Sequence, residues 1–114
     1  MRDRLYACAM EIVTLAQKRA FGDALKKVPL FDSERMLFDL YCLRPGQNQK
    51  AHSHEDADKV YVVLEGEALF EVDGEQELLP EGTAVIARAG ASHGVRNDST
   101  SSLVLMVVMA PRPA

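Results

Sequence analysis

The sequence lacks several features that would indicate particular classes of protein. No apolar run approaches the roughly 18–20 residues of a membrane-spanning helix, and the longest, LVLMVVMA at 103–110, has the length of a buried strand. Positive charge is not in excess, because 13 lysines and arginines stand against 17 aspartates and glutamates, giving a net charge of −4. These absences argue against a membrane protein and against a general nucleic-acid binder, which usually carries a basic face.

Cysteine is scarce, and the start of the chain does not resemble a secretion signal. Cys8 and Cys42 lie in unrelated segments without the spacing of a metal site. The apolar stretch LYACAM follows two arginines, but Glu11 ends it too early for a signal peptide. We therefore expect a cytoplasmic protein with two reduced, mostly buried thiols.

The usual local signatures of catalysis are also missing. The sequence has no phosphate-binding loop, no dinucleotide fingerprint, and no recognisable Ser-His-Asp or Cys-His arrangement. The acidic run at 55–58 lacks the spacing of an EF-hand and is typical of a solvated loop. Any chemistry must therefore come from residues that the fold brings together.

What is present indicates one domain. A chain of 114 residues with 47% apolar side chains is long enough for a single core and too short for two. Apolar residues in 2–19 fall on one stripe of an amphipathic helix, so we expect a helical extension over 1–27. From 28 to 110, short apolar runs alternate with turn signals, among them Asp73-Gly74, and this pattern predicts an all-β sandwich or barrel.

The histidines are the most informative residues. His52 and His54, two positions apart, present two imidazoles on one face of an extended strand, and His93 follows the turn sequence RAG. A lone histidine is more often a core or surface residue than a ligand. A barrel, however, lets strands distant in sequence point at a common centre, where three imidazoles bind a divalent transition metal.

Two motifs around these histidines resemble the cupin superfamily. The first runs from Gly46 to Gly66 as GQNQKAHSHEDADKVYVVLEG, with lysine where that family has glutamate. The second is GTAVIARAGASHGVRN at 82–97, with Arg88 in place of the usual proline. The resemblance implies a double-stranded β-helix, or jelly-roll barrel, that commonly pairs into homodimers. It also implies metal ligation by His52, His54 and His93, with Zn, Fe, Mn or Ni as the ion.

Lys59, which stands at the glutamate position, leaves several arrangements open. A protonated lysine has no lone pair to donate and repels a cation. The site is then a three-histidine centre with open positions, or a centre completed by a carboxylate at 55, 56 or 58. Alternatively the metal is lost and Lys59 serves anion binding or proton transfer, which makes it a weak catalytic candidate. It could also swing outward and pair with Asp56 or Asp58.

Strand alternation predicts which side chains face the barrel interior. Following the first motif, Lys59, Tyr61 and Val63 point inward, whereas the alternate positions between them are also apolar and point outward. We therefore expect the outer face to be covered by the N-terminal helix or by a second subunit of a homodimer. Phe70 and Met106, like Tyr61, are expected in the core or pocket lining, and Arg88 is expected in a turn.

Two classes of function remain open from the sequence. The first is a metal-dependent enzyme, and dioxygenases and isomerases of sugars or keto acids occur among proteins similar to this one. The second is a non-catalytic module that binds a metal or a small molecule in the same pocket. Because a fold does not determine a reaction, the sequence specifies a site more closely than an activity.

Overall fold

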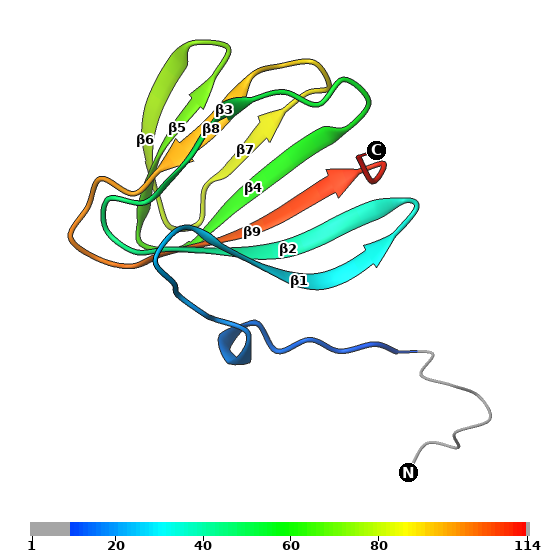
Figure 1. Cartoon of the computed structure of the whole chain (residues 1–114), viewed down its shortest axis with the longest axis horizontal. Coiled ribbons are helices and arrows are strands. Elements are labelled where there is room, and N and C mark those ends of the chain that lie inside the picture. The colour runs from blue at the N-terminus through cyan, green and yellow to red at the C-terminus, as the bar shows by residue number, and fades with distance from the viewer. Residues whose placement is uncertain (1–9, 114) are drawn as a thin grey trace.

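The computed structural model describes residues 10–113, in which two antiparallel sheets face each other (Figure 1). The larger sheet has the strand order β1-β2-β9-β4-β7, and the smaller sheet has the order β3-β8-β5-β6. The strands are β1 (Lys26–Ser33), β2 (Met36–Leu43), β3 (Asn48–His52), β4 (Asp58–Glu65), β5 (Glu67–Val72), β6 (Glu75–Pro80), β7 (Ala84–Ala87), β8 (His93–Arg96) and β9 (Leu103–Ala110). The all-β prediction is confirmed, and the two-sheet arrangement is a double-stranded β-helix.

Turn residues divide the strands where the sequence predicts. Asp73 and Gly74 both have positive φ, at 48° and 85°, and they join β5 to β6 as a two-residue hairpin turn. Such turns need left-handed conformations at both central positions, which glycine adopts freely and aspartate tolerates. The Asp-Gly pair therefore sets the register of this hairpin.

The predicted N-terminal helix is wrong for the part of the chain that the structure describes. Residues 10–19 contain one short 3₁₀ turn, η2 (Leu15–Gln17), and residues 2–9 of the predicted helix lie outside the described range. Thr14, directly before the turn, is extended, with φ −91° and ψ 106°. Ile12, Val13 and Thr14 are three consecutive β-branched residues. Such residues lose side-chain freedom in a helix, and this lowers their helix propensity. The apolar spacing suited a helix, but the local propensity did not.

The core lies between the sheets. Ten buried residues line it: Tyr41, Leu43, Tyr61, Val63, Ala68, Phe70, Val95, Leu103, Leu105 and Val107. A second, smaller cluster lies on the outer face of the larger sheet, where Phe21 packs against buried Leu40, Cys42 and Val104. The N-terminal segment thus covers part of the outer face as a strap rather than as a helix.

Several expectations about the chain's surroundings stay predictions. Cys42 is buried and forms no disulfide, while Cys8 lies outside the described residues. Within residues 10–113 no helix has the length and apolarity to span a membrane. The cytoplasmic location is untested. The boundary between extension and barrel expected at 27 and 28 is also untested, although β1 begins at Lys26.

The uncovered part of the outer face generates a test of the expected homodimer, which stays a prediction. Val60 pairs with Ile86 across β4 and β7 on this face, and Ile86 is 63% exposed. We expect Ile86→Asp to shift a dimer to monomer in light scattering, because it places a charge in an apolar contact. Leu78→Asp, at a 56% exposed leucine of β6 in the other sheet, is the matched control. A monomeric wild type, or an unchanged mass for Ile86→Asp, would contradict a dimer formed through this face.

Candidate metal centre

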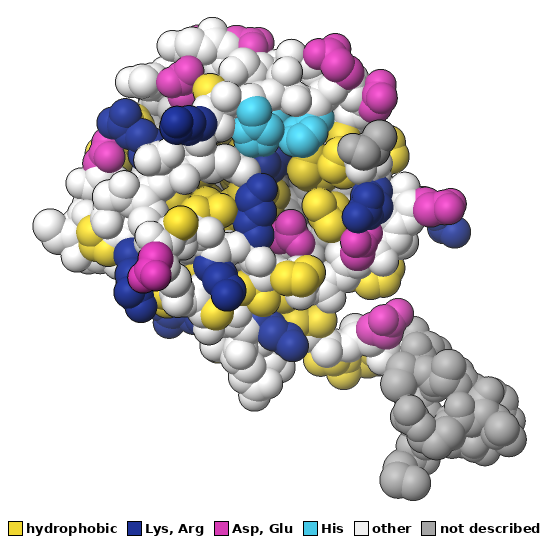
Figure 2. Space-filling model, viewed as in Figure 1, with side chains coloured by type: hydrophobic (Ala, Val, Ile, Leu, Met, Phe, Trp, Pro, Cys, Tyr) yellow, Lys and Arg dark blue, Asp and Glu magenta, His cyan; other side chains and the backbone are white. Residues whose placement is uncertain are grey.

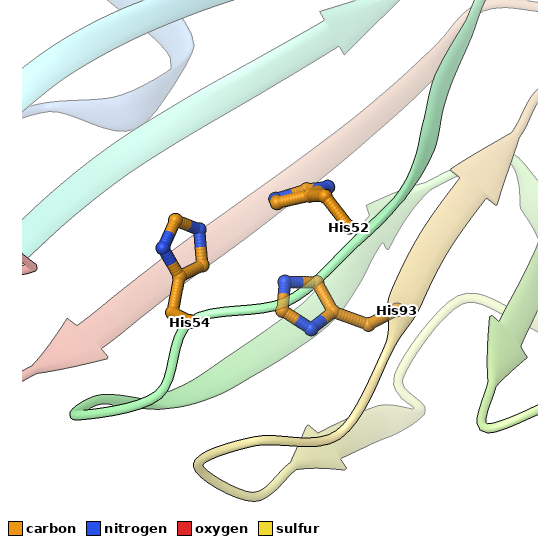
Figure 3. A group of neighbouring side chains, drawn as sticks. All are labelled: His52, His54 and His93. Atoms are coloured by element: carbon orange, nitrogen blue, oxygen red, sulfur yellow. The ribbon is translucent and has the colours of Figure 1, made fainter.

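The structure brings all three histidines of the sequence together (Figure 3). His52 ends β3, His54 follows in the next loop, and His93 begins β8. Their ring centroids lie 4.5 Å apart for His52 and His93, 5.0 Å for His52 and His54, and 5.7 Å for His54 and His93. One nitrogen from each ring falls within 4.8 Å of the others. Two nitrogens bound to one ion at about 2.0–2.1 Å lie no more than about 4.2 Å apart, so small rotations of the rings would bring all three to one ion.

Pairing of β3 with β8 sets this geometry. His52 lies directly opposite His93 in the antiparallel register, which is irregular between Gln49 and His52. A Cβ on Gly94 would lie 2.8 Å from the Gln49 carbonyl oxygen and 2.9 Å from the Ala51 nitrogen. Glycine is therefore required at this point of β8, because any side chain would push β3 away and separate the two histidines.

Hydrogen bonds orient two of the rings. The Nδ1 of His52 lies 2.9 Å from the Lys50 carbonyl oxygen, and the Nδ1 of His93 lies 3.0 Å from that of Ala91. A carbonyl only accepts, so Nδ1 carries the proton in each ring and Nε2 keeps its lone pair. The Nε2 of His93 is buried without a hydrogen-bond partner. Leaving a buried acceptor unsatisfied is costly, and a metal ion would satisfy it.

Burial keeps the imidazoles in the form that binds a metal. His93 is 2% exposed, and burial lowers its pKa to about 4, with smaller contributions from Lys59 and the other two histidines. Burial also lowers the pKa of His54, and the charges of His52 and Lys59 act in the same direction. Both rings are therefore neutral near pH 7 and offer lone pairs without first losing a proton.

No carboxylate joins this group in the described part of the chain. The residues that could together hold an ion are the three histidines, and the acidic residues at 55, 56 and 58 are absent from the group. Asp58 instead uses Oδ1 to accept a hydrogen bond of 2.8 Å from the Ala89 backbone nitrogen. A centre completed by a neighbouring carboxylate is therefore not supported, whereas a three-histidine centre fits the donor set.

Lys59 points into the barrel and is 1% exposed. The outward arrangement is wrong, since Lys59 forms no ion pair with Asp56 or Asp58 in the described chain. Its Nζ lies 4.9 Å from the ring centroid of Tyr61 and 5.2 Å from that of Tyr41. Burial lowers its pKa to about 7, helped by the charge of Lys27 and opposed by Asp39. The ammonium is thus destabilised where it stands.

The sequence reasoning missed four residues near Lys59, which are Gln49, Tyr41, Lys27 and Asp39. Gln49, on β3, accepts a hydrogen bond of 2.9 Å from the Tyr61 hydroxyl and lies 3.4 Å from the Tyr41 hydroxyl. Lys27 has its Nζ 5.3 Å from the Tyr41 ring centroid, and the charge of Asp39 acts on Lys59. These residues come from three strands, and the only sequence signal for them is alternation with inward apolar positions.

Of the remaining expectations from the sequence, those for Tyr61, Phe70 and Arg88 agree with the structure and that for Met106 does not. Tyr61 and Phe70 are buried between the sheets, as expected, and their rings lie 5.2 Å apart. The expectation of core or pocket lining is wrong for Met106, because it lies opposite Leu40 and Val62 in the strand register, on the outer face of the larger sheet. The Arg88 carbonyl accepts a hydrogen bond from the Ala91 nitrogen in the turn before β8. Arg88 thus occupies a turn, as predicted.

Fold and site together define a small β-barrel with a candidate metal centre inside one end, and comparisons with known proteins agree. The family model for the cupin domain matches residues 39–109. The chain therefore belongs to the cupin family.

Individual relatives extend the comparison. An oxalate-binding protein of Thermotoga maritima is 29% identical over 73 residues, which are 64% of this chain and 60% of that protein. The chain thus spans less than two thirds of that curated relative. The crystal structure of TT1209 from Thermus thermophilus is 53% identical, with a TM-score of 0.88, covering 91% of this chain and all of the other.

Other solved structures share the fold at greater distance. An RmlC-like cupin from Desulfovibrio desulfuricans is 27% identical, with a TM-score of 0.80 over 90% of this chain and 98% of the other. A predicted oxalate decarboxylase from Thermotoga maritima is 24% identical, with a TM-score of 0.73 over 76% of this chain and 80% of the other. The second likeness shows the fold alone.

The lowered pKa values predict how acid affects metal binding. Because protons compete for the imidazole lone pairs, affinity must fall at low pH. Burial moves protonation of His93 and His54 below the usual pKa of about 6.5, so zinc affinity should change little down to that pH. It should then fall steeply towards pH 4. Competition with a calibrated chelator measures this, and affinity that stayed constant to pH 4 would contradict histidine ligation.

Proposed function

We propose that the chain binds one divalent transition metal through His52, His54 and His93 and uses the ion to hold a small-molecule ligand. The observation that carries this proposal is the meeting of three imidazole nitrogens within 4.8 Å, one of them buried without a partner. Three imidazole nitrogen donors suit Zn, Fe, Mn or Ni, and they leave coordination positions for water or an oxygen ligand. When bound, such an ion polarises an oxygen group that coordinates it.

The ligand is proposed to be a small molecule with anionic oxygens. The Thermotoga relative is named for oxalate, and hard oxygen donors such as carboxylates readily complete a shell of imidazoles. Lys59 faces the same interior and favours negative charge there. We therefore favour carboxylate ligands over neutral sugars.

We favour a protein that binds its ligand without converting it. The relative is described by what it binds, and a metal with a small anion requires nothing beyond the residues already named. A metal-dependent dioxygenase or isomerase is the second candidate, since the open positions of a three-histidine ion would admit a second ligand. Product analysis after incubating the metal-loaded protein with oxalate and simple keto acids separates the two, because a binding module leaves them unchanged.

Removing one ligand tests the metal centre. We expect His93→Ala, and separately His52→Ala, to weaken zinc affinity by more than about 100-fold, because losing even an outer-sphere partner of a metal ligand costs about 10–100-fold. Elemental analysis after growth in metal-supplemented medium should find close to one ion per wild-type chain and little in either variant. Ser53→Ala, between two of the histidines, is the control. Equal occupancy in all four proteins would overturn the ligand assignment.

Restoring a carboxylate tests whether Lys59 faces the ion. We expect Lys59→Glu to tighten zinc binding by at least about tenfold, or about 1.4 kcal/mol, because it replaces a repelling cation with a fourth donor. Lys26→Glu makes the same charge change on an exposed residue of β1 and should have little effect. If both variants bind zinc as the wild type does, Lys59 does not face the ion.

A further inference from the structure

Lys59 has no counter-ion. In the described part of the chain its Nζ forms no ion pair, and its single hydrogen bond is a long one, 3.4 Å to the Oε1 of Gln49. An ammonium group carries three N–H donors, so two of them have no acceptor. A buried ammonium without a partner is costly, and retaining one calls for a compensating interaction.

The surroundings hold the ammonium in place without neutralising it. Two tyrosine rings lie within 5.2 Å of its Nζ, and Gln49 bridges their hydroxyls, so that Gln49 itself is fixed in orientation. The rings attract a cation through their faces but carry no net charge. Nearby, Lys27 adds a second cation and Asp39 a single anion. This end of the barrel interior therefore has a surplus of positive charge.

The ammonium lies close to the candidate metal centre, since its charge acts on both His93 and His54. The Tyr61 ring centroid lies 4.9 Å from the Nζ of Lys59 and 6.2 Å from the ring centroid of His93. Figure 2 shows histidines at the rim of a hollow, with lysine or arginine side chains beside them and apolar side chains around. A short ligand bound at the histidines would therefore extend towards the ammonium.

We propose that Lys59, oriented by Gln49 and the two tyrosines, binds one carboxylate of a short dicarboxylate ligand whose other carboxylate binds the ion at His52, His54 and His93. This inference rests on the proposed function and adds the substrate class and its second binding point. A dicarboxylate supplies negative charge at both ends, one for the metal and one for the unpaired ammonium. A charge-assisted hydrogen bond from Lys59 to the ligand uses donors that the protein leaves free.

The test compares charged and neutral ligands on zinc-loaded protein. Isothermal titration with oxalate, malonate and neutral oxamide is carried out on wild type, Lys59→Met and Lys26→Met. Methionine is unbranched and apolar, so it fits the buried position without an unpaired charge. We expect Lys59→Met to keep its zinc and its oxamide binding but to lose about tenfold to a hundredfold in affinity for the better-bound dicarboxylate. Lys26→Met removes an exposed charge and should bind as the wild type does.

Other outcomes separate this inference from the proposed function. Dicarboxylate binding that is unchanged in Lys59→Met overturns it, as does a zinc-loaded wild type that binds neither dicarboxylate. If the wild type binds no zinc, the proposed function fails and this inference fails with it, whereas the first of these outcomes overturns the inference alone. Should Lys59→Met not fold, as judged by circular dichroism, Lys59→Gln replaces it. Lys59→Arg, which keeps the charge, should retain more of the affinity than either neutral variant.

Discussion

The antiparallel pairing of β3 with β8 positions the site on which the functional argument depends. It sets His52 against His93 at the point where the two strands diverge, and the extended loop that follows returns His54 to the same centre. Close approach of the backbones at Gly94 leaves no room for a side chain. The His93 ring is oriented by a hydrogen bond from its Nδ1 to the Ala91 carbonyl oxygen. Its Nε2 is left buried without a partner. The candidate metal centre is thus built into the sheet.

The second constraint is the cation at Lys59. In the first of the two family motifs the position belongs to a glutamate, and here an ammonium group takes its place within the barrel. An ion and an ammonium repel each other more strongly inside a protein than in water, because the effective dielectric constant is lower. Under our proposals an anion between them removes that repulsion. Metal and ligand would then each favour the binding of the other, as linkage requires.

Membership of the cupin family establishes the barrel and leaves the reaction open. Similar barrels carry oxalate-binding and predicted decarboxylase names, and the likeness to the second of these reaches only the fold. Function therefore has to be argued from the site, where three imidazoles, one ammonium and an amide bridging two tyrosines lie close together. That set of groups recognises charge, and it contains no local signature of a nucleophile.

Local patterns in the sequence determined much of this protein. Alternation and turn residues such as Asp73-Gly74 predicted the strands, because backbone conformation at those positions depends on neighbouring residues alone. The spacing within two motifs singled out the three histidines. The apolar stripe near the N-terminus misled, because β-branched residues at 12–14 oppose the helix that the stripe favours.

Tertiary structure decided what no local pattern encodes. The side chains around Lys59 come from β1, β2 and β3, and the order of strands in the two sheets brings them to one end of the barrel. Strand alternation predicted that Lys59 points inward, but an exposed pairing with Asp56 or Asp58 also fitted the sequence, and only the folded barrel separated the two. Burial, the absence of an ion pair and the lowered pKa of Lys59 all follow from packing between sheets. The sequence by itself determined the strands and the side chains that could bind a metal, because both depend on local spacing. Only the folded barrel decided which charged groups lie close together, because these come from different strands.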